Sequence, residues 1–334
     1  MTKEELVEAI QKANAKATRQ EQLSDTGFVQ NNIPRVHVLH ENPEWIGPIA
    51  AALEAAGVPW SEWLMLDGEF DLDEAPPAGI FWSRMSASAH TRGHGRSKDQ
   101  ARAVLSWLEA HGRRVVNGRR VLELEMSKVD QLAHLRAAGF DVPRTVAVVG
   151  EDGLLAAAKK LPTPFVSKHN QGGKGLGVVR YDSHEAFEAD LPHREQPVDG
   201  ITLLQEYVEP AQPFITRVEI VGGRFLYALT ADTGRGGFQL CPADACAIET
   251  SGTESLFALR EGFDDPITGR YEQFSKSLGI EIAGFEFIQT ADGRQVTYDI
   301  NTNTNYNPEV DAAAPRSGPT QVAGYLGGLL EEAS

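Results

Sequence analysis

One stretch near the C-terminal end constrains the fold more than any other, the segment 283–305 with the sequence AGFEFIQTADGRQVTYDINTNTN. Two runs rich in aromatic and β-branched residues flank the dipeptide Asp292-Gly293. Asp-Gly between such runs predicts a β-hairpin with a tight turn, because a type I′ turn needs positive φ at both central residues.

Pairing outward from this turn sorts the side chains onto two faces, with Phe287 opposite Tyr298 and Glu286 opposite Asp299. The predicted core face carries the apolar and aromatic residues Phe285, Phe287, Val296, Tyr298 and Ile300. The opposite face carries Glu286, Ile288, Thr297, Asp299 and Asn301. One side of the hairpin is therefore apolar, and the other holds two acids and an amide.

The polar face of this hairpin has the composition of a metal site. Directly opposed carboxylates have Cβ atoms roughly 4.5–5.5 Å apart, which is unfavourable unless a positive group lies between them. Two carboxylates and an amide oxygen suit a hard divalent cation such as Mg²⁺. We therefore expect Glu286, Asp299 and Asn301 to be metal ligands. The alternative is a solvated strand face that carries two charges.

Composition excludes several classes of protein. The chain has 334 residues, enough for two or three domains, and its net charge of −16 argues against binding to nucleic acid. Two cysteines, Cys241 and Cys246, are too few for a disulfide framework. No apolar run approaches the roughly 18–20 residues that span a bilayer, and the charged N-terminus lacks the apolar core of a signal peptide. We expect a cytoplasmic protein that does not contact membranes.

The order of predicted elements divides the chain into four parts. Residues 1–32 read as a short amphipathic helix (2–17) and a linker. Between residues 33 and 125, strands alternate with helices, which predicts a small parallel α/β domain. Residues 126–200 and 201–334 then read as two α+β subdomains. The fold class is α/β and α+β combined.

A basic loop follows the third strand of the first domain, with the sequence SRMSASAHTRGHGRSK. Its charged and imidazole side chains are Arg84, His90, Arg92, His94, Arg96 and Lys98. In open α/β sheets, ligands gather beyond the carboxyl ends of the strands, so this loop is a candidate site for an anionic substrate. A solvated basic loop is the alternative, and zinc is improbable because no glutamate completes a zinc-binding helix.

Two lysines stand in positions that favour phosphate. Lys128 follows Ser127 at the start of a capped helix over 127–138, where a cation opposes the helix dipole. Lys168 ends the strand 165–168 and precedes the glycine-rich run QGGKGLG at 171–177. This run is not a P-loop, but its backbone N–H groups suit a phosphate lid. Read without its context, it is a flexible turn.

Two further segments complete the ordered set. The strand 201–208 ends in the sequence QEYV, and the run 215–230 predicts a second hairpin with Arg217 and Glu219 on one face. Arg235 lies in the loop that follows, among glycines. Helices are expected over 251–262, 268–278 and 319–332. The two cysteines are expected to be small buried residues, because their spacing does not fit a zinc pair.

Together these segments resemble the ATP-grasp superfamily, and more closely its glutathione-synthetase and ribosomal-protein glutamate-ligase branch. The resemblance covers about residues 33–310 and rests on the order of the motifs rather than on one of them. It implies a parallel α/β domain before two subdomains that clamp ATP. It also implies ATP and two Mg²⁺ ions, replaceable by Mn²⁺, as cofactors.

The resemblance also implies a role for each matching position. Lys128 and Lys168 would contact phosphates, under a mobile loop that contains Gly172, Gly173, Lys174 and Gly175. The backbone of the strand end would bind adenine through Glu206, Tyr207 and Val208. Arg217 would meet the transferring phosphoryl group, with Arg235 as a second candidate. The Mg²⁺ ligands would be Glu286, Asp299 and Asn301, and the candidate substrate residues are Arg84, His90, Arg92 and Asn303.

The chain departs from the family pattern at three places. Ile215 replaces the acid that usually binds ribose, so Glu209 or Gln212 would have to take that role. Asp299 replaces a longer glutamate among the metal ligands. After the second hairpin, GRGGFQLCPADAC replaces the arginine- and asparagine-containing run that the family usually carries there.

The function implied is an ATP-dependent carboxylate–amine ligase. A substrate carboxylate would attack the γ-phosphoryl group, and an amine would then displace phosphate from the acyl phosphate to form an amide. Both substrates are expected to be small molecules, an amino acid or peptide among them, and a homodimer is compatible with the sequence. The alternatives are a phosphotransferase of the same fold and a nucleotide-binding module without catalysis.

Overall fold

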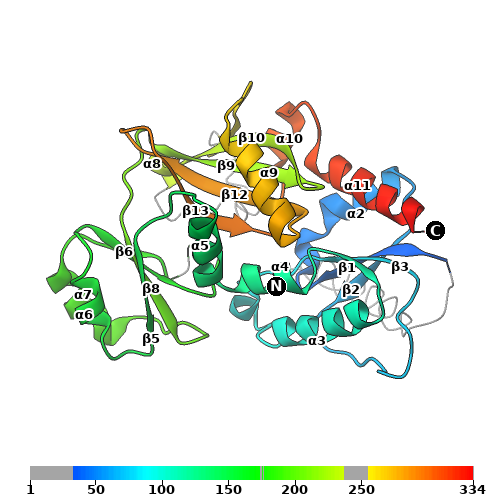
Figure 1. The fold of residues 1–334 in the computed structure, drawn as a ribbon, viewed down its shortest axis with the longest axis horizontal. Coiled ribbons are helices and arrows are strands. Elements are labelled where there is room, and N and C mark those ends of the chain that lie inside the picture. Colours follow the sequence, from blue (N-terminus) through cyan, green and yellow to red (C-terminus); the bar gives the residue numbers. More distant parts are fainter. Residues whose placement is uncertain (1–32, 174, 176, 237–254, 334) are drawn as a thin grey trace, which may run out of the picture.

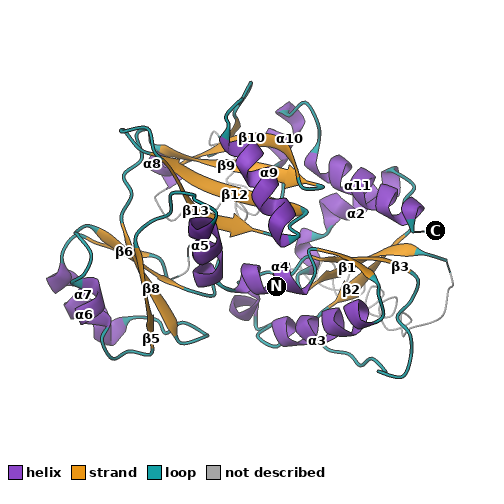
Figure 2. Ribbon diagram, in the orientation of Figure 1, coloured by secondary structure: helices purple, strands orange, loops and turns teal. Residues whose placement is uncertain are grey.

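The computed structural model describes residues 33–173, 175, 177–236 and 255–333, which form three β-sheets with helices packed on them (Figures 1 and 2). The predicted helix 2–17, its linker, Lys174 and both cysteines lie outside the described residues.

The first sheet is parallel throughout, as the alternating pattern predicted. Its strand order is β2-β1-β3-β4. Its strands are β1 (Arg35–His40), β2 (Trp60–Leu64), β3 (Gly79–Ser83) and β4 (Arg114–Val116). The associated helices are η1 (Pro43–Trp45), α2 (Gly47–Ala55), η2 (Ala89–Arg92), α3 (Ser97–Ala110) and the C-terminal α11 (Gly318–Glu332). Helices α2 and α11 cover one face and α3 covers the other, so both faces of the sheet are buried.

The second sheet is antiparallel, with the order β5-β8-β6-β7. Its strands are β5 (Thr145–Val149), β6 (Phe165–His169), β7 (Val179–Tyr181) and β8 (Ile201–Glu206). Its helices are α6 (Leu154–Ala158), α7 (His184–Asp190) and η3 (Leu191–His193), and α6 and α7 share one apolar core with the sheet. Strand β8 begins at Ile201, so the subdomain boundary expected at residue 200 falls within this sheet.

The third sheet is antiparallel, with the order β11-β10-β9-β12-β13. Its strands are β9 (Phe214–Val221), β10 (Arg224–Asp232), β11 (Phe257–Leu259), β12 (Ile282–Gln289) and β13 (Gln295–Asn301). The helices near it are α4 (Arg119–Met126), α5 (Lys128–Ala137), α8 (Thr233–Gly236), α9 (Ile267–Leu278) and α10 (Pro308–Ala313). Side chains of α4, α5 and α9 pack on one face of this sheet, and α11 contributes to the core on the other.

The helix expected over residues 251–262 is wrong in its described part. Residues 257–259 form β11, which pairs with β10 through three residue pairs. The segment has few residues with a helical period, and pairing with an open sheet edge satisfies the backbone N–H and C=O groups instead. Helix α4 was not expected from the sequence, although it completes the apolar core beneath β12.

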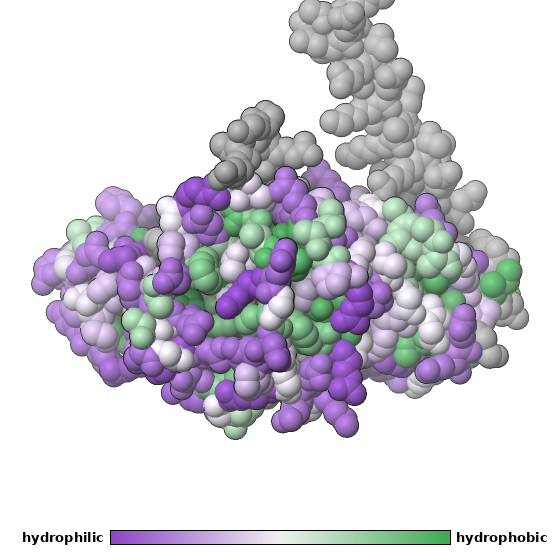
Figure 3. Space-filling model, turned by 90° about the horizontal axis from the view of Figure 1, so that it is seen from above, coloured by the Kyte–Doolittle hydropathy of each residue, from purple (hydrophilic) through white to green (hydrophobic). Residues whose placement is uncertain are grey.

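The surface agrees with the acidic, polar composition. Hydrophilic side chains cover most of the face seen from above, and apolar residues form smaller patches between them (Figure 3). Within the part of the chain that the structure describes, every helix is too short or too polar to cross a bilayer.

Candidate active site

The hairpin β12–β13 brings its two acids together as the sequence predicted, because Glu286 pairs directly with Asp299. The register shifts at the next position, where Phe287 faces Thr297 rather than Tyr298. Tyr298 is thus the extra residue of a β-bulge, which reverses the alternation of side chains toward the turn.

The bulge corrects the predicted faces of β13. Thr297 is fully buried on the core side, where its hydroxyl lies 2.7 Å from that of Tyr271. The Tyr298 hydroxyl instead donates to Glu286 Oε2 at 2.8 Å, on the side of the two acids. The expectation that Tyr298 lies on the core face and Thr297 on the opposite face was therefore wrong. Counting outward from a turn cannot reveal a bulge between the turn and the counted residue.

Glu286 is buried and accepts hydrogen bonds on both oxygens. Arg217 Nη1 donates to Oε1 at 2.8 Å, and Asn301 Nδ2 donates to the same atom at 3.1 Å. Burial raises the pKa of Glu286, while the neighbouring Arg217 acts in the opposite direction. Both oxygens of Glu286 thus have hydrogen-bond donors in this structure.

Arg217 comes from β9, the strand that pairs with β12 on the side away from β13. Its guanidinium donates to Glu219 Oε1 at 2.5 Å and to the Thr304 hydroxyl at 2.7 Å, in addition to Glu286. A Cβ added at Gly284 would overlap this guanidinium, so the glycine on β12 makes room for it. The arginine is 1% exposed and is held in one orientation.

Asp299 forms an ion pair with Lys128, whose Nζ donates to its Oδ1. Burial acts against the charge of Asp299, but Lys128 and Lys168 outweigh it and lower the pKa of this acid. Burial likewise opposes the charge of Lys128, and Asp299 outweighs it, so the pKa of Lys128 is raised. Burial and the nearby Lys128 lower the pKa of Lys168 to about 7.

Asn170 explains how the two lysines come together. Its backbone carbonyl accepts from Lys128 N at 3.2 Å, and its side-chain oxygen accepts from Val129 N at 2.8 Å. The first turn of α5 is thus bound to the end of β6, which carries Lys168. Lys128 is paired with Asp299, and an anionic group such as a phosphate beside Lys168 would favour the charged form of that lysine.

The donor set fits a hard divalent cation. Two opposed carboxylates and an amide lie on one face of the hairpin, within reach of cationic side chains that balance their charge in this structure. No cluster of three or more His, Cys, Asp or Glu side chains suited to a metal occurs in the described residues. A cation at Glu286, Asp299 and Asn301 would therefore complete its shell with oxygens of water or substrate, as Mg²⁺ does.

The glycine-rich loop lies against the first domain. A Cβ on Gly173 would be 3.2 Å from Cβ of Ser88, and Lys98 Nζ donates to Gln171 Oε1 at 2.8 Å. Gly172 and Gly175 belong to the described part of this loop. The contacts place the loop at the junction between the first and second sheets.

The predicted hinge, Glu206 to Val208, lies where the chain passes from the second sheet to the third. The guanidinium carbon of Arg180 lies 4.2 Å from the ring centroid of Tyr207. Both proposed substitutes for the ribose acid, Glu209 and Gln212, are exposed in the connecting segment.

The residues of the basic loop differ in their exposure and in the groups that they contact. Arg84 is 2% exposed and donates to the carbonyls of Trp45 and Thr304, both at 3.1 Å, and to the Asn305 side chain. It therefore fixes the segment after β13 to the first domain. His90 Nδ1 donates to the Ala87 carbonyl at 3.1 Å, and burial lowers the pKa of His90.

Arg92 and Asn303 have groups that a ligand could contact, whereas Arg84 is occupied by backbone carbonyls. Arg92 pairs with Glu41 at 2.5 Å and is partly exposed. The side-chain oxygen of Asn303 is buried without a hydrogen-bond partner among the described residues, next to the segment that Arg84 holds. Arg235 contacts Asp232 and the Ser255 carbonyl rather than a residue of the site.

Sequence reasoning missed the roles of Glu219, Tyr298, Asn170 and Glu41. Glu219 was placed on the correct face, two residues from Arg217, and this spacing was the available signal. Asn170 and Glu41 follow directly on strands β6 and β1, at strand ends where ligands gather. Tyr298 gave no signal, because its position depends on the bulge.

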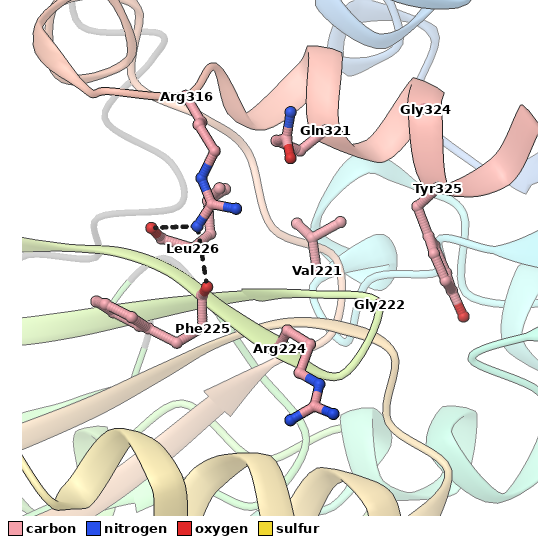
Figure 4. Close-up of a pocket in the computed structure, with 9 residues that line it drawn as sticks. All are labelled: Val221, Gly222, Arg224, Phe225, Leu226, Arg316, Gln321, Gly324 and Tyr325. Atoms are coloured by element: carbon pink, nitrogen blue, oxygen red, sulfur yellow. Dashed lines mark hydrogen bonds between the residues drawn. The ribbon is translucent and has the colours of Figure 1, made fainter. Parts of the chain in front are cut away.

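A separate pocket of about 290 Å³ lies between the β9–β10 turn and α11 (Figure 4). It is lined by Val221, Gly222, Arg224, Phe225, Leu226, Arg316, Gln321, Gly324 and Tyr325. None of these residues belongs to the site around Glu286, and Arg316 is directed at the carbonyls of Phe225 and Leu226.

Comparison with known proteins identifies the fold. No protein-family model matches the chain. It is 26% identical over 208 residues to beta-citrylglutamate synthase B of Danio rerio, covering 61% of this chain and 48% of that protein. It is also 26% identical over 233 residues to a probable alpha-L-glutamate ligase of Mannheimia succiniciproducens, covering 67% of this chain and 71% of the relative. The chain thus spans about half the length of the first of these curated relatives.

Solved structures match over most of the chain. The ATP-grasp ligase PsnB, in complex with a minimal precursor, has a TM-score of 0.62 and 18% identity, covering 89% of this chain and 99% of that one. A RimK domain ATP-grasp protein from Sphaerobacter thermophilus has a TM-score of 0.61 and 19% identity, covering 88% and 99%. The D-cycloserine synthetase DcsG has a TM-score of 0.60 and 18% identity, covering 90% and 100%. The predicted fold is confirmed: the chain has the fold of these ATP-grasp structures.

Proposed function

We propose that this protein is an ATP-dependent carboxylate–amine ligase that forms an amide through an acyl phosphate and releases ADP and phosphate. The observation that carries this proposal is the convergence of Glu286, Asp299 and Arg217 with Lys128 and Lys168 on one face of the third sheet. Phosphoryl transfer depends on positioning and charge neutralisation, and these side chains supply both without a protein nucleophile.

The lysines hold the phosphates in this proposal. Lys128 at the start of α5 and Lys168 at the end of β6 neutralise oxygens of the nucleotide, and phosphate binding returns Lys168 to its charged state. Mg²⁺, two ions of it or Mn²⁺ in its place, would be held by Glu286, Asp299 and Asn301 and would offset the charge of the phosphates when bound.

Arg217 stabilises the reacting group. Glu219 and Thr304 fix the plane of its guanidinium, so that Nη1 points at the position of Glu286. If Glu286 held a cation, this N–H edge of Arg217 would be available to the phosphoryl group in transfer. The same edge then stabilises the acyl phosphate while an amine attacks its carbonyl carbon and phosphate leaves.

Adenine would bind between the second and third sheets, along the backbone of Glu206 to Val208. Glu209 or Gln212 would reach the ribose. We place the boundary between the two subdomains after β8, because this strand pairs with β5 and β6.

The names of the relatives support a ligase that joins an acid to an amine. The similar proteins are named glutamate ligases and beta-citrylglutamate synthase, and the structural neighbours include ligases in complex with precursor peptides. We propose small carboxylates and amines of the amino-acid type as substrates, bound in part by Arg92 and Asn303.

The test is a screen for ADP and phosphate release over pairs of acids and amines. We expect turnover only when both are present, with a product whose mass equals their sum less one water. Glu286→Gln should lower kcat at least about a hundredfold, whereas Glu188→Gln on the exposed face of α7 should leave it unchanged. A phosphorylated substrate without an amide would indicate a kinase, and ATP binding without turnover would indicate a binding module.

A further inference from the structure

The strand that carries Asp299 and Asn301 is an open edge of the third sheet. Among the described strands, β13 pairs only with β12, so the backbone N–H and C=O groups on its other side need partners from elsewhere. Helix α5 lies beside this edge (Figure 1), and the last turn of α4 reaches the same strand. Side chains of these helices, rather than another strand, therefore bind the edge next to the two proposed metal ligands.

Gln131 of α5 binds Ile300, the residue between Asp299 and Asn301. Its Oε1 accepts from Ile300 N at 3.1 Å, and its Nε2 donates to the Ile300 carbonyl at 2.9 Å. The same Nε2 donates to the Leu124 carbonyl at 3.0 Å, which joins the side chain to the end of α4. The buried amide of Gln131 thus takes the place that the backbone of a neighbouring strand would have.

Glu125 of α4 binds the residue on the other side of Asn301. Its Oε2 accepts from Thr302 N at 2.8 Å and from the Thr302 hydroxyl at 2.9 Å. Its Oε1 accepts from Ala87 N at 3.3 Å, in the loop that follows β3. The Thr302 carbonyl accepts from Asn117 Nδ2 at 3.3 Å. Asn301 therefore lies between two residues whose backbone groups are held by side chains of other elements.

Glu125 is an expensive residue for covering a strand edge. It is 8% exposed, and among the described residues no cation forms an ion pair with it. Burial raises its pKa, while the hydrogen bonds from Thr302 and Ala87 act in the opposite direction. A neutral acceptor covers an edge without this cost, as the Asp141 carbonyl does for Thr297 N at 2.8 Å. A buried carboxylate at this position therefore has a purpose besides covering the edge.

The hydrogen bonds of Glu125 require a carboxylate. Each of its three partners is a donor, and the donors are divided between both of its oxygens. An ionised carboxylate accepts at both oxygens, whereas a side-chain amide accepts at one and presents an NH₂ group at the other. Glutamine at this position would therefore release either Thr302 or Ala87. Only the carboxylate fixes the end of the hairpin to the loop after β3.

We propose that Glu125 and Gln131 are positioning residues that hold Asp299 and Asn301 in the geometry that binds the divalent cation; this inference rests on the metal site of the ligase function proposed above. Neither side chain contacts the cation. They act through the backbone of Ile300 and Thr302, on either side of Asn301. Removing groups that orient metal ligands lowers metal affinity on the order of 10–100-fold.

The test compares the affinity for ADP with and without Mn²⁺ and does not need turnover. The full chain is titrated with ADP in a calorimeter, once in EDTA and once with Mn²⁺ in excess over ADP. The ratio of the two affinities measures how much the cation contributes to binding. We expect a ratio of at least about thirty for the wild type and at most about three for Glu125→Gln, with unchanged affinity in EDTA.

Two further variants separate positioning from stability. Gln131→Met removes both hydrogen bonds to Ile300 without adding a charge, and should lower the ratio as Glu125→Gln does. Glu272→Gln is the matched control, because Glu272 Oε1 accepts from the backbone of the same sheet, at Phe225 N (2.9 Å), away from the site. This control should keep the wild-type ratio. Urea denaturation measures the stability of each variant, and a purely structural role would lower stability without changing the ratio.

The possible results distinguish the inference from the proposed function. A wild-type ratio in folded Glu125→Gln and Gln131→Met would overturn the inference alone. Equal affinities for ADP with and without Mn²⁺ in the wild type would overturn both the inference and the metal site. Because the readout is binding, a protein whose ratio depends on Glu125 but that forms no amide would refute the ligase function and leave the inference standing.

Discussion

At the scale of single residues, Arg217 illustrates how the site is built at the expense of ordinary packing. Its guanidinium is buried between Glu219 and Glu286 and takes the space where a side chain on Gly284 would lie. Gly284 pairs with Glu219 and Asn301 on neighbouring strands, so the missing Cβ lies in the centre of the sheet. Glycine in a strand interior often marks such a close approach.

Gly284→Ala is expected to reduce both stability and activity. The added methyl group displaces Arg217, and overpacking of this kind costs about 1–3 kcal/mol of unfolding free energy. Activity should fall at least about tenfold, since the arginine no longer faces the phosphoryl group. Urea denaturation and ADP release measure the two effects.

Gly269→Ala provides the matched control. Gly269 is exposed in α9, and no atom lies within 4 Å of the position that an added Cβ would take. Alanine there should leave stability unchanged or raise it by up to about 1 kcal/mol. Equal effects of the two substitutions would contradict the role given to Gly284.

At Lys168, the buried amine proposed to bind phosphate also reduces the stability of the folded protein. Its pKa is lowered to about 7 by burial and by Lys128, whereas an unfolded lysine titrates near 10.4. Between these values the unfolded chain holds a proton that the folded protein lacks, so this residue's contribution to stability increases with pH. Well below pH 7, where Lys168 is protonated in the folded protein as well, the cost of the buried charge is fully present.

Lys168→Met should therefore raise stability while removing nucleotide binding. At pH 6.5 we expect an increase on the order of 2 kcal/mol in the free energy of unfolding, which declines toward pH 10. Affinity for MgATP should fall at least about a hundredfold, because a buried charge partner of the phosphates is lost. Lys159→Met, at an exposed position after α6, is the control. A Lys168→Met variant that is less stable and still binds MgATP would refute this assignment.

At the scale of elements, the hairpin β12–β13 shows what sequence can determine and what it cannot. The Asp-Gly turn and the apolar alternation predicted the pairing of Glu286 with Asp299, because both are local signals. The bulge at Tyr298 follows from the packing of Thr297 against Tyr271 of α9, a contact between residues 26 apart in the chain. Arg84 was likewise predicted near a ligand, but its carbonyl partners depend on how two domains meet.

Tyr298→Phe tests the bulge as part of the site. The Tyr298 hydroxyl donates to Glu286, and a hydrogen bond to a charged group contributes about 1.5–3 kcal/mol. We expect kcat to fall about tenfold and the free energy of unfolding to fall by no more than the contribution of this hydrogen bond, because the ring keeps its packing. Tyr325→Phe removes a hydroxyl that donates to Glu281, away from the site, and should leave kcat unchanged. Equal kcat values for Tyr298→Phe and wild type would show that this hydrogen bond does not contribute to catalysis.

At the scale of the whole molecule, the elements that local sequence patterns specify were predictable, whereas the strand orders of the three sheets were not. The parallel first sheet, the glycine-rich hairpin and the acidic hairpin were all located. The junctions between sheets were not, since Asn170 binds the first turn of α5, which packs on the third sheet, and the Thr304 carbonyl accepts from Arg84 of the first domain. Those junctions form the site.

The first sheet gives the molecule a pH dependence. His37 is buried against Phe81, with its ring nitrogens 2.7 Å from the Ser61 hydroxyl and 3.1 Å from the Ala78 carbonyl. Burial lowers its pKa to about 4. The unfolded chain takes up this proton below about pH 6.5, so stability from His37 is lost as the pH falls from 6.5 to 4.

His37→Gln should reduce the loss of stability on acidification. Between pH 7 and 4.5, the wild-type free energy of unfolding should fall by about 2–3 kcal/mol more than that of the variant. Urea denaturation at the two pH values measures the loss of stability in each protein. Subtracting one loss from the other removes the contribution of the other titrating groups. Identical losses in both proteins would show that the imidazole is not held neutral.

The most direct test of the ligase mechanism follows an oxygen atom. The acid identified by the ADP-release screen is labelled with ¹⁸O in its carboxylate and incubated with ATP, Mg²⁺ and the amine. An acyl phosphate places one carboxylate oxygen in the released phosphate, so mass spectrometry should find one ¹⁸O atom per phosphate and none in ADP. Unlabelled phosphate, or label in AMP, would contradict the mechanism proposed for the site around Glu286, Asp299 and Arg217.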